Sequence, residues 1–223
     1  MTTPTGVRRG WERKFEAPAG SEAHLVHALD ALLARDRHGD GGYAVHSVYF
    51  DTPDLAVHRR CPIHGRAKLR IRRYGESSTV FLERKAKDEH GWVDKVRTEL
   101  AADRLVGTAS LTRSDVPDIQ WFAALLAAGN FAPNRRIACR RTAWDGILDG
   151  LAMRVTLDLD IRAAPANGTL LPGPLPHGQA LTDRPLLEIK GDAEFPATLE
   201  RLLATLGATP VDFSKYRRSV ELA

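Results

Sequence analysis

Residues 67–87, AKLRIRRYGESSTVFLERKAK, alternate apolar and charged side chains in two segments that flank a short polar turn. This alternation predicts two β-strands, because successive side chains of a strand point to opposite faces of a sheet. Lys68, Arg70 and Arg72 then form one row on one face, and the next strand carries a second charged row. A row of like charges repels itself, so the pattern predicts an anionic partner.

The same alternation recurs in six predicted strands. In residues 151–161, LAMRVTLDLDI, the apolar side chains share one face, and Arg154, Thr156, Asp158 and Asp160 share the other. The charged face of a single strand is ordinarily just solvated. Here, however, neutral polar residues are scarce and bases recur from strand to strand. The repetition favours a sheet that turns its charged face inward around a basic lumen.

The predicted elements indicate an α+β fold. About eight strands, mostly joined in hairpins, alternate with helices at the start, middle and end of the chain. An antiparallel eight-stranded β-barrel with flanking helices would bury the apolar faces and remove exposed edges. With 223 residues, 43% of them hydrophobic, we expect a flexible N-terminus over residues 1–10 and a single domain over residues 11–223.

Composition limits the classes of partner. The net charge is only +4, and neither an exposed basic helix nor an RNA-binding aromatic motif is apparent, so we expect no nucleic acid. Two distant cysteines, Cys61 and Cys139, are expected to be free thiols in a reducing compartment. No secretory h-region and no run of about 18 apolar residues is present, so we expect no transmembrane segment and a cytoplasmic location.

The lumen chemistry points to phosphate. Arginine forks bind phosphate oxygens bidentately and lysines add point charge. Carboxylates among such bases can hold a hard divalent cation that bridges phosphate oxygens. The sequence therefore predicts a site for a triphosphate or a polyphosphate chain.

Nine short motifs, spread from about residue 11 to residue 221, carry a family resemblance. In chain order they are ERKF, SVYFDTPDL, KLRIRRYG, VFLERK, DKVR, RRTAW, MRVTLDLD, LLEIK and FSKYRRSVE. The set resembles the VTC (vacuolar transporter chaperone) domain, the polyphosphate-polymerase branch of the triphosphate tunnel metalloenzyme (CYTH-like) superfamily. Only Glu12 and Lys14 match the Glu-x-Glu-x-Lys strand of hydrolytic relatives, which favours the polymerase branch.

The resemblance implies transfer of the ATP γ-phosphoryl group to a growing polyphosphate chain, with Mn²⁺ or Mg²⁺ as cofactor. The implied catalytic bases are Lys14, Arg70, Arg72, Lys85, Arg141 and Arg154. Further phosphate-binding bases are Lys95, Arg97, Lys190 and Lys215. The implied metal ligand is Glu188, while Glu12, Glu83 and Asp158 are weaker metal candidates that could equally orient neighbouring arginines.

Several alternatives stay open on the sequence. A tripolyphosphatase or nucleoside triphosphatase of the same fold, or a non-catalytic polyphosphate- or nucleotide-binding module, would use the same lumen. Any coupling to export would need a separate membrane partner. In RRIACRRTAW, Arg141 shares a face with Ile137 and Cys139, so either a β-bulge intervenes or Arg140 faces the lumen instead.

Overall fold

The fold is that of a computed structural model, which describes residues 10–36, 41–63, 67–87, 93–105 and 117–222. Residues 1–9 of the expected flexible N-terminus lie outside the described residues. The strands are β1 (Trp11–Glu16), β2 (Ala34–Arg35), β3 (Tyr43–Asp51), β4 (Ala67–Tyr74), β5 (Thr79–Lys87), β6 (Val93–Ala101), β7 (Ala132–Leu148), β8 (Leu151–Pro165), β9 (Gln179–Ala180), β10 (Leu186–Gly191) and β11 (Thr209–Pro210). The helices are α1 (Glu22–Asp30), α2 (Ala56–Arg59), α4 (Pro117–Ala128), α5 (Ala197–Thr205), α6 (Lys215–Glu221) and the 3-10 helix η1 (Ala102–Arg104).

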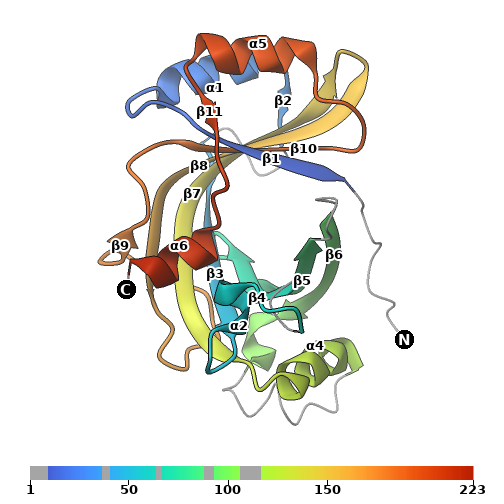
Figure 1. The fold of residues 1–223 in the computed structure, drawn as a ribbon, viewed down its shortest axis with the longest axis vertical. Helices are drawn as coiled ribbons and strands as arrows, with labels where there is room; N and C mark the ends of the chain where they lie inside the picture. Colours follow the sequence, from blue (N-terminus) through green and yellow to red (C-terminus); the bar gives the residue numbers. More distant parts are fainter. Residues whose placement is uncertain (1–9, 37–40, 64–66, 88–92, 106–116, 223) are drawn as a thin grey trace.

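All strands belong to one antiparallel sheet in the order β11-β1-β10-β8-β7-β3-β4-β5-β6, with β2 added on β7 and β9 on β8. The long β7–β8 hairpin links the two halves of the sheet (Figure 1). Asp149 and Gly150 form its turn, both with positive φ (53° and 78°). Such φ values match the right-handed twist of the flanking strands, which is why Asp-Gly suits a two-residue hairpin turn.

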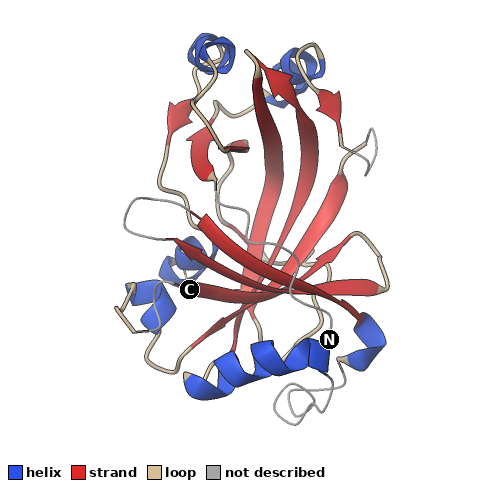
Figure 2. Cartoon of the chain, turned by 90° about the vertical axis from the view of Figure 1, so that its right-hand side faces the viewer, coloured by secondary structure: helices blue, strands red, loops and turns tan. Residues whose placement is uncertain are grey.

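The sheet curls strongly without closing by a ladder (Figure 2). In the described part of the chain, no strand pairing joins β6 to β1, and the order ends at β6 on one side and at β11, next to β1, on the other. The two margins nevertheless approach, because the Val93 N–H donates to the Gly10 carbonyl at 3.3 Å. The antiparallel α+β fold with flanking helices is thus confirmed, as a tunnel-like sheet of eleven strands that include the short β2, β9 and β11.

The alternation of apolar and charged residues sets the two faces of this sheet. On β4 and β5, Leu69, Ile71 and Leu82 are buried on the outer face, in a cluster that contains Phe122 of α4. The helices α1 and α5 cover the outer face of β8 and β10 in a second cluster, and Figure 1 shows both helices above these strands. The charged faces consequently point inward.

The helix α6 packs on part of the inner face instead. Its Tyr216 stacks on Tyr49 of β3, with ring centroids 5.5 Å apart and planes 19° apart, and belongs to the same buried cluster as Ile137 and Cys139 of β7. This explains why apolar residues share a face with Arg141. Both cysteines in the described chain are free.

A β-bulge lies in the β7–β8 ladder, where the register shifts between Ala138 and Arg140. The extra residue is on β8, at Asp160, whose φ is +47°. The bulge exposes Asp160 and turns Ile161 into the buried cluster around α6. The expected inner-face position of Asp160 is therefore wrong, because period two does not continue through a bulge.

Among the residues that the structure describes, no helix combines the length and the apolar character needed to span a membrane.

Candidate phosphate-binding site

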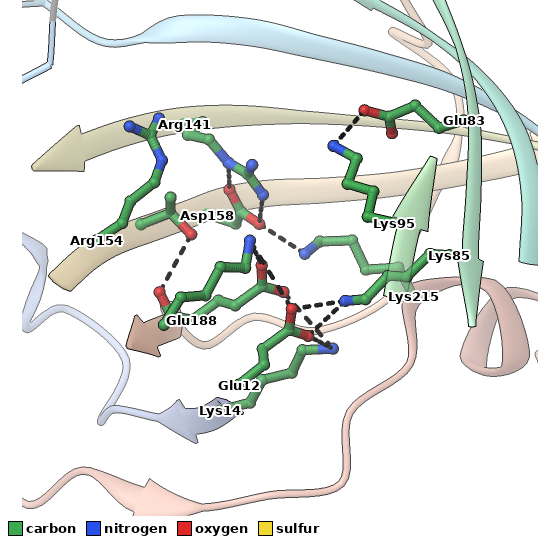
Figure 3. Close-up of polar contacts among 12 residues, drawn as sticks. Glu12, Lys14, Glu83, Lys85, Lys95, Arg141, Arg154, Asp158, Glu188 and Lys215 are labelled. Carbon is green, nitrogen blue, oxygen red and sulfur yellow. Dashed lines mark hydrogen bonds and ion pairs between the residues drawn. The ribbon is translucent and has the colours of Figure 1, made fainter. Parts of the chain in front are cut away.

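Four buried carboxylates organise the inner face, and the basic side chains gather around them (Figure 3). They come from β1, β5, β8 and β10, strands that are far apart in sequence but that the curled sheet turns toward one another. The side chains of Glu83 and Asp158 are fully buried, and those of Glu12 and Glu188 are 8% and 10% exposed. Buried carboxylates of this kind need cationic partners, because an unpaired buried charge is strongly unfavourable.

Glu83 on β5 is fully buried and is surrounded by four bases. The Arg70 Nε lies 2.6 Å from Oε2 and the Lys95 Nζ lies 2.5 Å from Oε1. Arg72 and Arg97 lie at 4.0 and 3.8 Å. Burial raises the pKa of Glu83, but Arg70, Arg72 and Lys95 outweigh it and hold the pKa well below its usual range. Glu83 is therefore an anionic brace for the bases of β4 and β6.

Asp158 on β8 is also fully buried and binds two cations directly. Arg141 donates from Nε to Oδ1 at 2.6 Å and from Nη2 to Oδ2 at 2.7 Å. Lys215, the first residue of α6, donates to Oδ2 at 2.6 Å. Arg141 is buried whereas Arg140 is exposed, so Arg141 is the arginine that faces the lumen. The Asp158 carboxylate therefore accepts three bonds from these two bases and fixes their position.

Glu12 on β1 and Glu188 on β10 form a third group, in which two carboxylates share lysines. The Lys14 Nζ lies 3.5 Å from Glu12 Oε1 and 3.7 Å from Glu188 Oε2. Lys190 contacts Glu188 Oε1 and lies 3.8 Å from Glu12 Oε2. Lys85 of β5 donates to Glu12 Oε2 at 2.6 Å, which bridges the open margin of the sheet. Burial lowers the pKa of Lys85 to about 8 despite the two carboxylates.

The three groups together place thirteen of the expected residues on one inner surface. Arg154 departs from them. Its guanidinium donates to Asp36 at 2.7 Å and also to Asp145, and its side chain is 35% exposed. Arg154 is thus paired with the buried Asp36 and with Asp145, and not with any of the four carboxylates of the three groups.

Lys68 lies at the site although it was not among the expected ligands. Its Nζ donates to the Ser214 hydroxyl at 2.9 Å. Burial, followed by the charges of Lys14, Arg217 and Lys85, lowers its pKa well below the usual value. Lys68, Lys14 and Lys85 line a cavity of about 1020 Å³. The alternation of β4 places Lys68 in the same row as Arg70 and Arg72. This shared row is the feature of the sequence from which Lys68 could have been predicted as a site residue.

Charge is unbalanced across the inner surface. Its four carboxylates are accompanied by ten bases, which leaves a formal excess of six positive charges; the bases are Lys14, Lys68, Arg70, Arg72, Lys85, Lys95, Arg97, Arg141, Lys190 and Lys215. Arginine forks and lysine ammonium groups in a half-enclosed lumen favour a multiply charged oxyanion. The arrangement is suited to binding several phosphoryl groups in a row.

Comparison with known families agrees with this geometry. The model of the VTC domain matches residues 19–223. This chain belongs to the VTC domain family. The match covers β2–β11 and all the helices, and it starts after β1, so it includes the strands that carry Glu83, Asp158 and Glu188. Among curated protein sequences, none matches this VTC domain.

Solved structures show the same fold at low sequence identity. HpAC1 of Hippeastrum, a candidate adenylyl cyclase with a dominant triphosphatase activity, is 16% identical with a TM-score of 0.55, over 95% of each chain. A candidate adenylate cyclase from Bacillus halodurans is 16% identical with a TM-score of 0.58, over 94% of this chain and 96% of that one. The VTC domain therefore has the triphosphate tunnel fold expected from the sequence.

Proposed function

We propose that this VTC domain is a metal-dependent polyphosphate polymerase, which transfers the γ-phosphoryl group of ATP to the end of a growing polyphosphate chain. The observation that carries the proposal is the excess of six positive charges around four buried carboxylates on one inner surface. Membership of the VTC domain family supports it. The free cysteines are consistent with a reducing, cytoplasmic setting.

The residues fit a divalent cation that binds together with phosphate. Among the described residues, no three histidine, cysteine or acidic side chains gather as a metal cage. Mg²⁺ is commonly held by one or two carboxylates, with substrate phosphates and water completing its octahedron. Glu188 and Glu12 would supply such carboxylates, since they share Lys14 and Lys190. A bound Mg²⁺ or Mn²⁺ would neutralise charge on the phosphate oxygens.

The bases would do most of the remaining chemistry. In phosphoryl transfer the charge spreads over the equatorial oxygens, and catalysis rests on positioning and electrostatic stabilisation. A terminal phosphate oxygen of the polymer is already anionic, so no general base is needed. Arg70 and Arg141 are held by Glu83 and Asp158 at 2.6 Å, and we propose that these guanidiniums are pre-oriented for phosphoryl oxygens.

Hydrolysis is the second candidate. The dominant triphosphatase activity of HpAC1, a protein of the same fold, favours it. In that case water would replace the polymer end as nucleophile, on the same phosphate-binding surface. The cavity of about 1020 Å³ beside Lys68 and Lys85 favours the polymerase, because it offers room beyond the buried bases for a chain to continue.

The deciding experiment is to incubate the purified protein with ATP and Mn²⁺ and to follow ADP, inorganic phosphate and polyphosphate together. ADP matched by long-chain polymer on a gel is the expected result. Phosphate without polymer would replace the polymerase by a triphosphatase. Tripolyphosphate binding without turnover would overturn catalysis in favour of a binding module.

The metal role is tested by Glu188→Gln, which removes the charge and keeps the shape. We expect this variant to lose metal-dependent turnover at least 100-fold while retaining tripolyphosphate binding. Asp160→Asn is the matched control, because Asp160 is an exposed bulge residue 2.7 Å from Arg162 and asparagine tolerates positive φ. Normal turnover of Glu188→Gln would refute the metal assignment.

A further inference from the structure

The inner face changes from basic to aromatic toward one end of β4, β5 and β6. Tyr74 follows Arg70 and Arg72 in the inward-facing row of β4, and Phe81 precedes Glu83 in that of β5. The two rings meet edge to face, with centroids 5.5 Å apart and planes 66° apart. The Arg97 guanidinium carbon lies only 3.4 Å from the Phe81 ring centroid and 5.6 Å from that of Tyr74.

These side chains are supported from behind and remain partly accessible. Tyr74 and Tyr43 form a second edge-to-face pair at 5.8 Å, and both pack against the buried cluster around Val45. Phe81 is only half-buried, and the Arg97 side chain is 35% exposed. The outer face of the same strands is already filled by the cluster beneath α4. The aromatic face therefore belongs to the lumen side and not to the core under α4.

The aromatic group adjoins the phosphate-binding bases directly. Arg97 lies against the Phe81 ring and at the same time 3.8 Å from Glu83, the brace of Arg70 and Lys95. Residues two apart on a strand are about 7 Å apart, so Phe81 is one inward-facing step from Glu83. A ligand whose phosphates lie among these bases would bring whatever is attached to them to Phe81 and Arg97.

We infer that Tyr74, Phe81 and Arg97 form the binding platform for the purine base of a nucleoside triphosphate. This inference rests on the proposed function and adds the position of the base. Nucleobases stack on aromatic rings and on arginine planes, whatever their hydrogen-bonding pattern. The base extends the Phe81–Arg97 stack, and Tyr74 forms its side wall. Stacking depends on the aromatic ring of the base and not on its substituents. The affinities for ATP and GTP are therefore expected to lie within about threefold of each other.

The expected gain from the platform is measurable. Stacking of a base on a protein side chain of this kind typically strengthens binding by about 5- to 150-fold. Inorganic tripolyphosphate carries three phosphoryl groups without a base, and one more ionisable oxygen than ATP because none of its phosphates is esterified. Comparing a variant with the unaltered protein, separately for each ligand, therefore isolates the platform from the phosphate-binding bases.

The test is calorimetric titration of the full chain with ATP and with tripolyphosphate, both with Mg²⁺. Phe81→Leu removes the ring and leaves every base of the inner surface in place. This variant should lose at least fivefold in affinity for ATP and stay within twofold for tripolyphosphate. Trp121→Leu is the control, because Trp121 lies on α4 at the outer face, bonded to Thr98 of β6, and should change neither affinity.

The outcomes separate this inference from the proposed function. Equal losses for both ligands, or no loss for either, would overturn the base platform. If the unaltered protein binds neither ligand, the proposed function itself fails. Retained tripolyphosphate binding shows that each variant is folded.

Discussion

Glu83→Gln is the most direct test of the idea that a buried carboxylate braces the lumen. Glu83 is completely buried, and the change removes its charge while keeping its shape. The nearest bases are Arg70 at 2.6 Å and Lys95 at 2.5 Å. Removing one partner of a buried ion pair costs about 3–5 kcal/mol, because the other charge stays buried and uncompensated.

The structure places the cost at the lower end of that range. The Lys95 side chain is 32% exposed and can turn to solvent, and Arg70, which is 12% exposed, keeps its bond to the Tyr49 hydroxyl at 2.9 Å. We therefore expect a loss of about 3 kcal/mol in the free energy of unfolding. For a chain of this size, that loss lowers Tm by about 6–12 °C.

Thermal melting followed by circular dichroism measures the effect, with Asp160→Asn as a control expected to shift Tm by less than about 2 °C, since exposed ion pairs contribute little. Tripolyphosphate should raise the Tm of Glu83→Gln more than that of the unaltered protein, because the anion takes over the role of the carboxylate. A fall in Tm of less than about 2 °C, or equal stabilisation by tripolyphosphate, would refute the bracing role.

Three further results are expected. Affinity for tripolyphosphate, measured by calorimetry, should fall about tenfold between pH 7 and pH 9. Burial gives Lys85 a pKa of about 8, so Lys85 loses its positive charge as the pH rises. Nearby bases outweigh the burial of Tyr74 and give it a pKa of about 8, so Tyr74 gains a negative charge over the same range. Lys85→Arg should make the affinity depend much less on pH, and an unchanged slope would contradict the role of Lys85 in this pH dependence. Arg141→Lys should lower turnover about tenfold through loss of its bidentate fork, whereas Arg140→Lys should leave turnover within twofold. Equal effects of the two changes would contradict the proposed role of Arg141 in binding phosphoryl oxygens. Asp158→Asn should lower Tm by several degrees, and an unchanged Tm would argue against its ion pairs.

Local alternation fixed which residues share a face, and the structure agrees wherever the strand is regular. On β4, Leu69 and Ile71 are buried outside and Arg70 and Arg72 point inside, because side-chain period is a property of the extended backbone alone. The bulge at Asp160 breaks that regularity. Neighbouring residues carry no signal for it, since a bulge depends on how two strands pair.

The choice between Arg140 and Arg141 shows more clearly what strand alternation cannot predict. Apolar Ile137 and Cys139 argued against Arg141 on the sequence, because an inner face was expected to be polar throughout. The helix α6, from the far end of the chain, covers that part of the inner face and makes it apolar. A residue's surroundings were therefore set by a segment remote in sequence, as Tyr216 and Asn134 also show with a bond across 82 positions.

The sequence by itself determined the antiparallel α+β class, the basic inner face and most members of the site, because strand periodicity and charge are local. Only the tertiary structure decided which carboxylate holds which base: that Lys85 reaches Glu12 across 73 positions, that Asp158 takes Arg141 and Lys215, and that Arg154 is bound by Asp36. Pairing depends on distances of a few ångströms between side chains remote in sequence. Those distances follow from the curl and register of the whole sheet, which no single strand encodes.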